Sequence, residues 1–156
     1  LEHDSNPRCF LKAIKRKLKN NGEVILSFPN CDSLYRKIFG KKWIHWHVPY
    51  HCNFFTKKSF EILVSEMGFK IIKSKTITPN LWTVLQMRRL FTSSHKNEKN
   101  AIWNLQHHWS NKRSIKSKII TATLKLTLNL AIIMIAPIDR FIDLTGQGDS
   151  FVVFLK

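Results

Sequence analysis

The sequence predicts an α/β fold, and three observations support this prediction. An amphipathic helix over residues 7–18 precedes a buried strand over 23–28. A capped helix over 56–67 precedes a second strand over 69–76. A helix of about 12 residues that leads into a short apolar strand is a crossover unit of an α/β sheet. The third observation is size, because 156 residues, 44% of them hydrophobic, can bury one domain-sized core.

The first unit carries clear boundary signals. Pro7 suits the first turn of a helix, and Ser5 or Asn6 can cap it. Gly22 follows two asparagines and suits the left-handed end of that helix. The strand that follows is a near-continuous apolar run from Val24 to Phe28, as a buried strand of a parallel sheet requires.

A short helix and an aromatic loop separate the two units. Asp32 or Ser33 can cap a helix that runs through Ile38. Residues 41–55 then form a loop rich in Trp, His and Phe.

The second unit has an equally clear pattern. Thr56 is the predicted cap of its helix, and Gly68 closes that helix. The predicted apolar face of the helix consists of Phe60, Leu63, Val64 and Met67. Lysines alternate with apolar residues over 69–76, which indicates a strand near the edge of the sheet.

The second half of the chain is predicted to be helical. One helix is expected over 80–91, an exposed loop over 93–100, and an apolar helix over 115–136. Pro137 marks the end of that helix or a bend in it. Lys125 and several polar residues lie inside the apolar run, so a buried or interfacial helix is favoured over a membrane span.

The composition restricts the class of protein. The net charge is +16, from 26 Lys and Arg against 10 Asp and Glu. Cys9, Cys31 and Cys52 form no C-x-x-C pair, which favours a reduced, cytoplasmic setting over a disulfide framework. The basic residues are spread along the chain without a nucleic-acid-binding motif, so a nucleic-acid partner is not expected.

The order of features in residues 21–69 resembles the second half of a class I S-adenosylmethionine (SAM)-dependent methyltransferase, from the Methyltransferase-23-like branch whose fifth strand ends in Pro-Asn. Pro29-Asn30 matches that strand end. Leu1-Glu2-His3 resembles the end of the fourth strand, and residues 146–156 resemble the final strand. In the family this final strand runs antiparallel between the fifth and sixth strands.

The resemblance implies a domain organisation and an activity. Residues 1–76 would be the C-terminal half of a Rossmann-like core, 77–145 a helical insertion or cap, and 146–156 the last strand. The reaction would transfer the SAM methyl group to an oxygen, nitrogen or carbon of a small-molecule, sugar or lipid-precursor acceptor. The Gly-rich turn and the acidic residue of the SAM site would lie upstream of Leu1, so we expect a truncated domain that lacks most of that site.

The resemblance also assigns site residues. It places Leu1, Glu2 and His3 beside the methionine end of SAM, although Glu2 and His3 can instead cap the following helix. It assigns the acceptor pocket to Asn30, Trp43, Tyr50 and His51. His51 is a candidate general base because its ordinary pKa lies near neutrality; the alternative is that it stiffens the loop. For Asn30 a structural role in a tight turn is favoured over substrate contact.

A metal site in the aromatic loop is a weaker interpretation. His45, His47, His51 and Cys52 are four zinc-ligand types within eight residues. Structural zinc sites usually take two separated ligand pairs, and this cluster has no second pair, so no metal is expected. His107 and His108 are expected to be loop residues.

Two other functions remain open. The basic charge and the apolar segment 112–136 could dock on an anionic membrane surface, which would make the protein membrane-peripheral. The chain could also be a methyltransferase fragment without activity.

Overall fold

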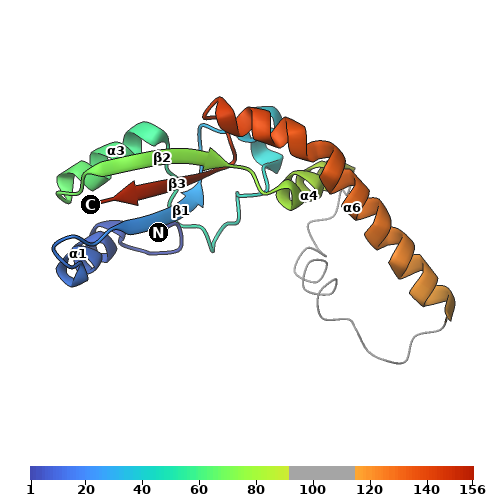
Figure 1. Ribbon diagram of the computed structural model, residues 1–156, viewed down its shortest axis with the longest axis horizontal. Coiled ribbons are helices and arrows are strands. Elements are labelled where there is room, and N and C mark those ends of the chain that lie inside the picture. The colour runs from blue at the N-terminus through green and yellow to red at the C-terminus, as the bar shows by residue number, and fades with distance from the viewer. Residues whose placement is uncertain (92–114) are drawn as a thin grey trace.

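The computed structural model describes residues 1–91 and 115–156 (Figure 1). Helices, strands and one short 3-10 helix (η1) alternate along these residues. In chain order they are α1 (Pro7–Lys17), β1 (Val24–Pro29), α2 (Leu34–Phe39), η1 (Gly40–Lys42), α3 (Lys57–Glu66), β2 (Ile71–Ile77), α4 (Asn80–Phe91), α6 (Ile115–Leu144) and β3 (Ser150–Leu155). The predicted mixture of helices and strands is therefore confirmed.

The three strands form one small sheet in the order β1-β3-β2. β3 is antiparallel to both neighbours, and Phe151 lies opposite Phe28 on one side and Thr76 on the other. The last strand thus enters between the two earlier ones, as the resemblance implied. The expected Rossmann-like core would contain further parallel strands, which this sheet does not include.

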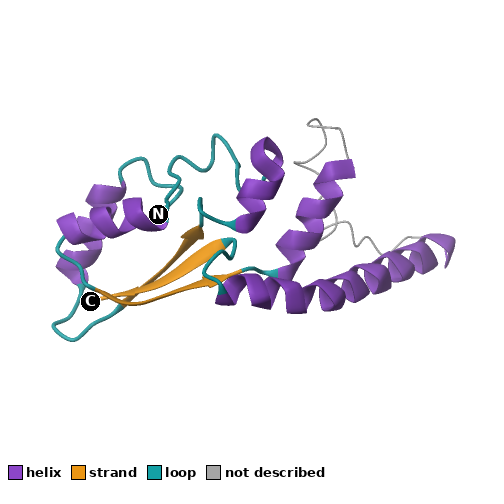
Figure 2. Cartoon of the chain, turned by 90° about the horizontal axis from the view of Figure 1, so that it is seen from above, coloured by secondary structure: helices purple, strands orange, loops and turns teal. Residues whose placement is uncertain are grey.

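Helices α1 and α3 cover one face of the sheet (Figure 2). Alternate residues of β1 and β3 point to this face, as the period-two geometry of strands requires. The buried core residues are Leu11 of α1; Phe28 of β1; Phe60, Leu63 and Val64 of α3; Phe55 and Phe69; and Phe151, Val153 and Leu155 of β3. The predicted apolar face of residues 60–67 is confirmed by this packing.

The helix starts follow the capping chemistry in the sequence. Asn6 caps α1 by accepting a hydrogen bond from the Cys9 amide, with Pro7 in the first turn. Thr56 caps α3 and forms a reciprocal capping box with Ser59. Each cap satisfies amide donors that the first turn of a helix leaves without an intrahelical partner.

Helices α4 and α6 lie beyond the carboxyl ends of β1 and β2 (Figure 1). Of the two alternatives for Pro137, an end of the apolar helix is excluded, because α6 continues to Leu144. Proline removes one helical hydrogen bond, but tertiary contacts fix the turns beyond it. Asp139 and Ile142 in those turns are both buried. Within residues 1–91 and 115–156, no helix is both long and apolar enough to cross a bilayer.

Gly68 tests the backbone geometry at the end of α3. Its φ is +72°, and an added Cβ would lie 2.3 Å from the Lys15 ammonium nitrogen. We expect Gly68→Val to destabilise the fold by about 1–2 kcal/mol or more, because the left-handed conformation is costly for a β-branched residue. Thermal unfolding followed by circular dichroism measures this change.

Gly68→Asn is the matched control, since asparagine tolerates the left-handed conformation better than valine. We expect it to lower the melting temperature less than Gly68→Val. An unchanged melting temperature in Gly68→Val would contradict the requirement for glycine.

Candidate functional site

The carboxyl end of β1 is fixed by Asn30. Its side chain is fully buried, and its Nδ2 donates to the Gly148 carbonyl at 2.8 Å. Its Oδ1 accepts from the Asp32 amide, which makes the turn after the strand. The Asn30 amide also donates to the Asp149 carbonyl. Asn30 therefore joins β1 to the turn before β3, and direct substrate contact by this residue stays a prediction.

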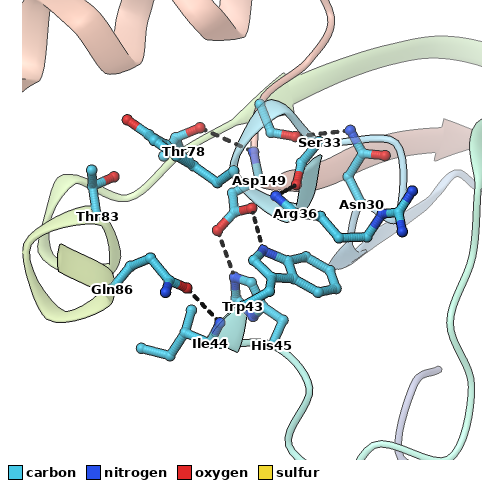
Figure 3. Close-up of polar contacts among 12 residues, drawn as sticks. Asn30, Ser33, Arg36, Trp43, Ile44, His45, Thr78, Thr83, Gln86 and Asp149 are labelled. Carbon is cyan, nitrogen blue, oxygen red and sulfur yellow. Dashed lines mark hydrogen bonds and ion pairs between the residues drawn. The ribbon is translucent and has the colours of Figure 1, made fainter. Parts of the chain in front are cut away.

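A buried carboxylate holds the start of the aromatic loop (Figure 3). Trp43 is fully buried, and its Nε1 donates to Asp149 Oδ1 at 2.8 Å. His45 Nε2 lies 3.0 Å from Asp149 Oδ2, although not in hydrogen-bond alignment. The Asp149 amide donates to Thr78 Oγ1. We call Asn30, Trp43, His45, Thr78 and Asp149 the polar network.

Helix α4 supports the same loop from the other side. Gln86 is almost fully buried; its Nε2 donates to the Lys42 carbonyl at 2.9 Å, and its Oε1 accepts from the Ile44 amide (Figure 3). Both hydrogen bonds run to backbone groups on either side of Trp43. The loop is therefore held in a defined conformation by the Asp149 side chain, just before β3, and by the Gln86 side chain of α4.

Asp139 links three helices at this end of the sheet. Its carboxylate accepts hydrogen bonds from Tyr35 of α2 at 2.6 Å and from Thr83 of α4 at 3.0 Å. Burial raises the pKa of Asp139, while the hydrogen bonds from Tyr35 and Thr83 oppose the rise. Burial and the contact with Asp139 also raise the pKa of the Tyr35 hydroxyl, which keeps it a hydrogen-bond donor.

A second group of polar side chains lies at the N-terminal segment. The His3 and His51 ring centroids are 4.7 Å apart, and His3 Nε2 lies 3.7 Å from Glu2 Oε1. The Glu2 carbonyl accepts from the amides of Cys52 and Asn53, so the backbone joins the same two segments. We call Glu2, His3 and His51 the histidine cluster.

Hydrogen bonds to backbone carbonyls orient both imidazoles of the cluster. His3 Nδ1 lies 2.9 Å from the Tyr50 carbonyl, and His51 Nδ1 lies 2.9 Å from the His45 carbonyl. A carbonyl only accepts, so in the neutral form of each ring Nδ1 is the protonated nitrogen. The lone pair of each ring then lies on Nε2.

Burial lowers the pKa of His51, and the hydrogen bond to the His45 carbonyl offsets part of that effect. The neutral imidazole is therefore the prevailing form of His51 near pH 7. This is the form that a proton acceptor or a metal ligand needs.

His45 connects the polar network to the histidine cluster. Its ring contacts Asp149, and its carbonyl accepts from the His51 ring. The sequence interpretation considered His45 only as a zinc ligand and missed this connection. It also missed Asp149, although a carboxylate just before an apolar final strand is a detectable signal.

The predicted site residues fall into separate places. Glu2, His3 and His51 come together, and Tyr50 contributes its carbonyl while its side chain is exposed. Leu1 packs partly against the main core. Asn30 and Trp43 belong to the buried polar network. The four suggested zinc ligands of the aromatic loop do not converge; instead, ligand atoms of Glu2, His3 and His51 lie within 4.8 Å of one another.

Residues 1–91 and 115–156 contain no Gly-rich turn of the kind that binds SAM in such folds. All five glycines lie in the described residues, and none occupies a turn from a strand into a helix, where a Gly-rich binding loop belongs. A hollow beside α3, lined in part by Phe60, Ile71 and Phe151, has an empty volume of about 190 Å³. This volume includes open solvent, and the hollow lies on the α3 face of the sheet.

Comparison with known proteins finds one family similarity, over the first half of the chain. Residues 1–74 match the family model described as a methyltransferase domain. No curated protein gives a significant match to the chain. The matched region contains the histidine cluster, the strand end at Asn30 and the aromatic loop. Over residues 1–74 the chain is therefore similar to the family of class I, SAM-dependent methyltransferases.

Proposed function

We propose that this chain forms the acceptor side of a Rossmann-like methyltransferase domain that transfers the SAM methyl group to a small-molecule, sugar or lipid-precursor acceptor. The match over residues 1–74 supports methyl transfer as the reaction. The finer statements, on the acceptor and on the share of the domain that this chain supplies, are ours.

One observation carries the proposal. The segment that the resemblance places beside SAM, at Glu2 and His3, adjoins the segment that it assigns to the acceptor, at Tyr50 and His51. The contacts are the 4.7 Å ring approach of His3 and His51 and the hydrogen bond from His3 to the Tyr50 carbonyl. Methyl transfer requires its two substrates to meet in this way.

The position of α4 and α6 supports a role in acceptor selection. Both helices lie at the carboxyl ends of β1 and β2, the edge at which open α/β sheets bind ligands (Figure 1). Thr78 and Gln86 connect this helical region to the polar network and the aromatic loop. We therefore assign residues 77–145 to a cap beside the acceptor.

His51 is the proposed general base. Its Nδ1 is engaged with the His45 carbonyl, which leaves the Nε2 lone pair available. A methyl acceptor that carries a hydroxyl must lose a proton during the reaction, and a neutral imidazole can take it. The ring is held by packing and by one hydrogen bond, as positioned bases are.

The present chain should bind SAM weakly, because the described residues supply only one side of the site. We expect isothermal titration of the 156-residue chain with SAM to show no micromolar binding. Glu2→Gln is the matched variant that separates weak specific binding at the N-terminal segment from non-specific binding. A micromolar dissociation constant would mean that the chain holds a complete site and that our assignment is wrong.

In a form of the protein that transfers methyl groups, His51→Ala should lower turnover more than SAM affinity. The expected loss is about 10²–10⁴-fold, the usual contribution of a general base. His47→Ala is the matched control, because His47 is an exposed imidazole of the same loop. Unchanged turnover in His51→Ala would leave this histidine a structural residue.

A membrane surface is a second candidate partner, and α6 supplies the observation that favours it. Seven large apolar side chains of α6 are 53–86% exposed: Leu126, Leu130, Ile133, Met134, Ile138, Phe141 and Leu144. They are spaced three or four residues along the helix, except for one adjacent pair. An exposed apolar stripe of this length marks an interaction surface. Lys112 and Arg113, which the sequence analysis placed in the same segment, lie outside the described residues.

Flotation with neutral and phosphatidylserine-containing vesicles tests this partner. We expect salt-sensitive binding to the anionic vesicles alone, because basic residues near the surface each contribute about 1 kcal/mol. The double substitution Ile133→Ser/Met134→Ser should reduce that binding, whereas Ile25→Ser, at an exposed position of the sheet, should not. Absence of binding, or equal binding by both variants, would contradict the proposal.

A further inference from the structure

Three metal-ligand side chains converge at the N-terminal end of the site. Glu2 and His3 come from the first residues of the chain, and His51 comes from the end of the aromatic loop. One ligand atom from each lies within 4.8 Å of the other two. The sequence analysis expected no metal because it sought ligands within one loop, and this set combines two segments.

The hydrogen bonds of the two histidines prepare them as ligands. A metal-bound imidazole usually donates its other ring N–H to a carbonyl or a carboxylate, which fixes the tautomer and the ring orientation. His3 Nδ1 contacts the Tyr50 carbonyl and His51 Nδ1 contacts the His45 carbonyl, each at 2.9 Å. Both Nε2 lone pairs therefore remain available to an ion. The orientation of the two rings is a second observation, separate from the short distances among the three groups.

The spacing fits an ion after small side-chain rotations. Two ligands of a tetrahedral zinc ion with bonds of about 2.0–2.1 Å lie roughly 3.3 Å apart. His3 Nε2 and Glu2 Oε1 are already 3.7 Å apart. Oε1 is thus the Glu2 carboxylate oxygen that faces His3. The His3 side chain is 60% exposed and can rotate into place.

We propose that Glu2, His3 and His51 bind one divalent transition-metal ion, with Zn²⁺ as the best match to two imidazoles and one carboxylate. Imidazole nitrogen favours zinc and its neighbours in the first transition row, whereas magnesium and calcium prefer all-oxygen sets. Three protein ligands leave at least one coordination position open, which is the arrangement of catalytic rather than structural zinc sites.

The ion would bind through the Nε2 lone pair of His51, which is the same lone pair that accepts the proton in the general-base proposal. With the ion bound, His51 cannot also take a proton. The open coordination position could instead hold an acceptor oxygen and lower its pKa, as zinc does for bound water. The metal site is nevertheless a property of this chain, and it does not depend on the methyl-transfer proposal.

Titration of the metal-free chain with Zn²⁺ alone tests the site. We expect one tightly bound ion per chain by calorimetry. Glu2→Gln and His51→Ala should each weaken binding about 10–100-fold or more, since even the loss of an outer-shell partner costs that much. His47→Ala and Cys52→Ser should retain wild-type affinity, because neither side chain belongs to the cluster.

A second measurement identifies the ligand atoms in the unsubstituted chain. On addition of Zn²⁺, long-range ¹H–¹⁵N spectra should show the change at Nε2 of His3 and His51 and not at the other histidines. Absence of binding, equal loss in His47→Ala or Cys52→Ser, or changes at other histidines would overturn the proposal. The zinc titration and the turnover measurement of His51→Ala are separate experiments. Either proposal can therefore fail while the other stands.

Discussion

The carboxylate of Asp149 fixes the positions of the segments that make up the site. It lies just before β3 and is 2% exposed. Its two oxygens take the Trp43 indole N–H and contact the His45 ring, while its backbone bonds Asn30 and Thr78. A carboxylate this deeply buried is costly without such partners. The ends of β1 and β2 and the aromatic loop are therefore held by one residue just before the last strand.

The histidine cluster depends indirectly on Asp149 as well. Asp149 positions His45, and the His45 carbonyl orients the His51 ring. His51 then stacks edge-on against His3. A change at Asp149 would disturb a site whose reacting groups it does not touch. The chain of contacts also explains why the aromatic loop, which has little regular structure, can present one imidazole in a defined tautomer.

Local chemistry in the sequence predicted most of the elements. The caps at Asn6 and Thr56, and the boundaries of α4, depend on neighbouring residues, and local rules are sufficient for them. The length of α6 was underestimated because the rule for Pro137 is also local, whereas the helix beyond it is held by Asp139 contacts to Tyr35 and Thr83. Such contacts join distant residues, and no periodicity in one sequence reveals them.

The site, too, combines features that the sequence predicted with features that depend on contacts between distant residues. The resemblance brought His3 and His51 into one hypothesis, but it could not give the hydrogen bonds that set their tautomers. Asn30 and Trp43 were assigned to the acceptor pocket by their place in the motif. Their side chains are fully buried and bonded within the protein, and their contact with the acceptor stays a prediction. A motif position carries the residue type and its approximate location, whereas the orientation of its side chain is decided by partners just before β3.

The carboxylates that are buried or paired inside the fold also make the protein surface more positive. Asp139 and Asp149 are buried, and Asp143 is paired with Arg140. Asp32 accepts from the Lys57 amide, so it too has a structural partner. The chain has 10 acidic residues against 26 basic ones. Each carboxylate that is buried therefore leaves the exposed surface more positive. A surface of this charge attracts anions at long range, and an anionic partner stays a proposal.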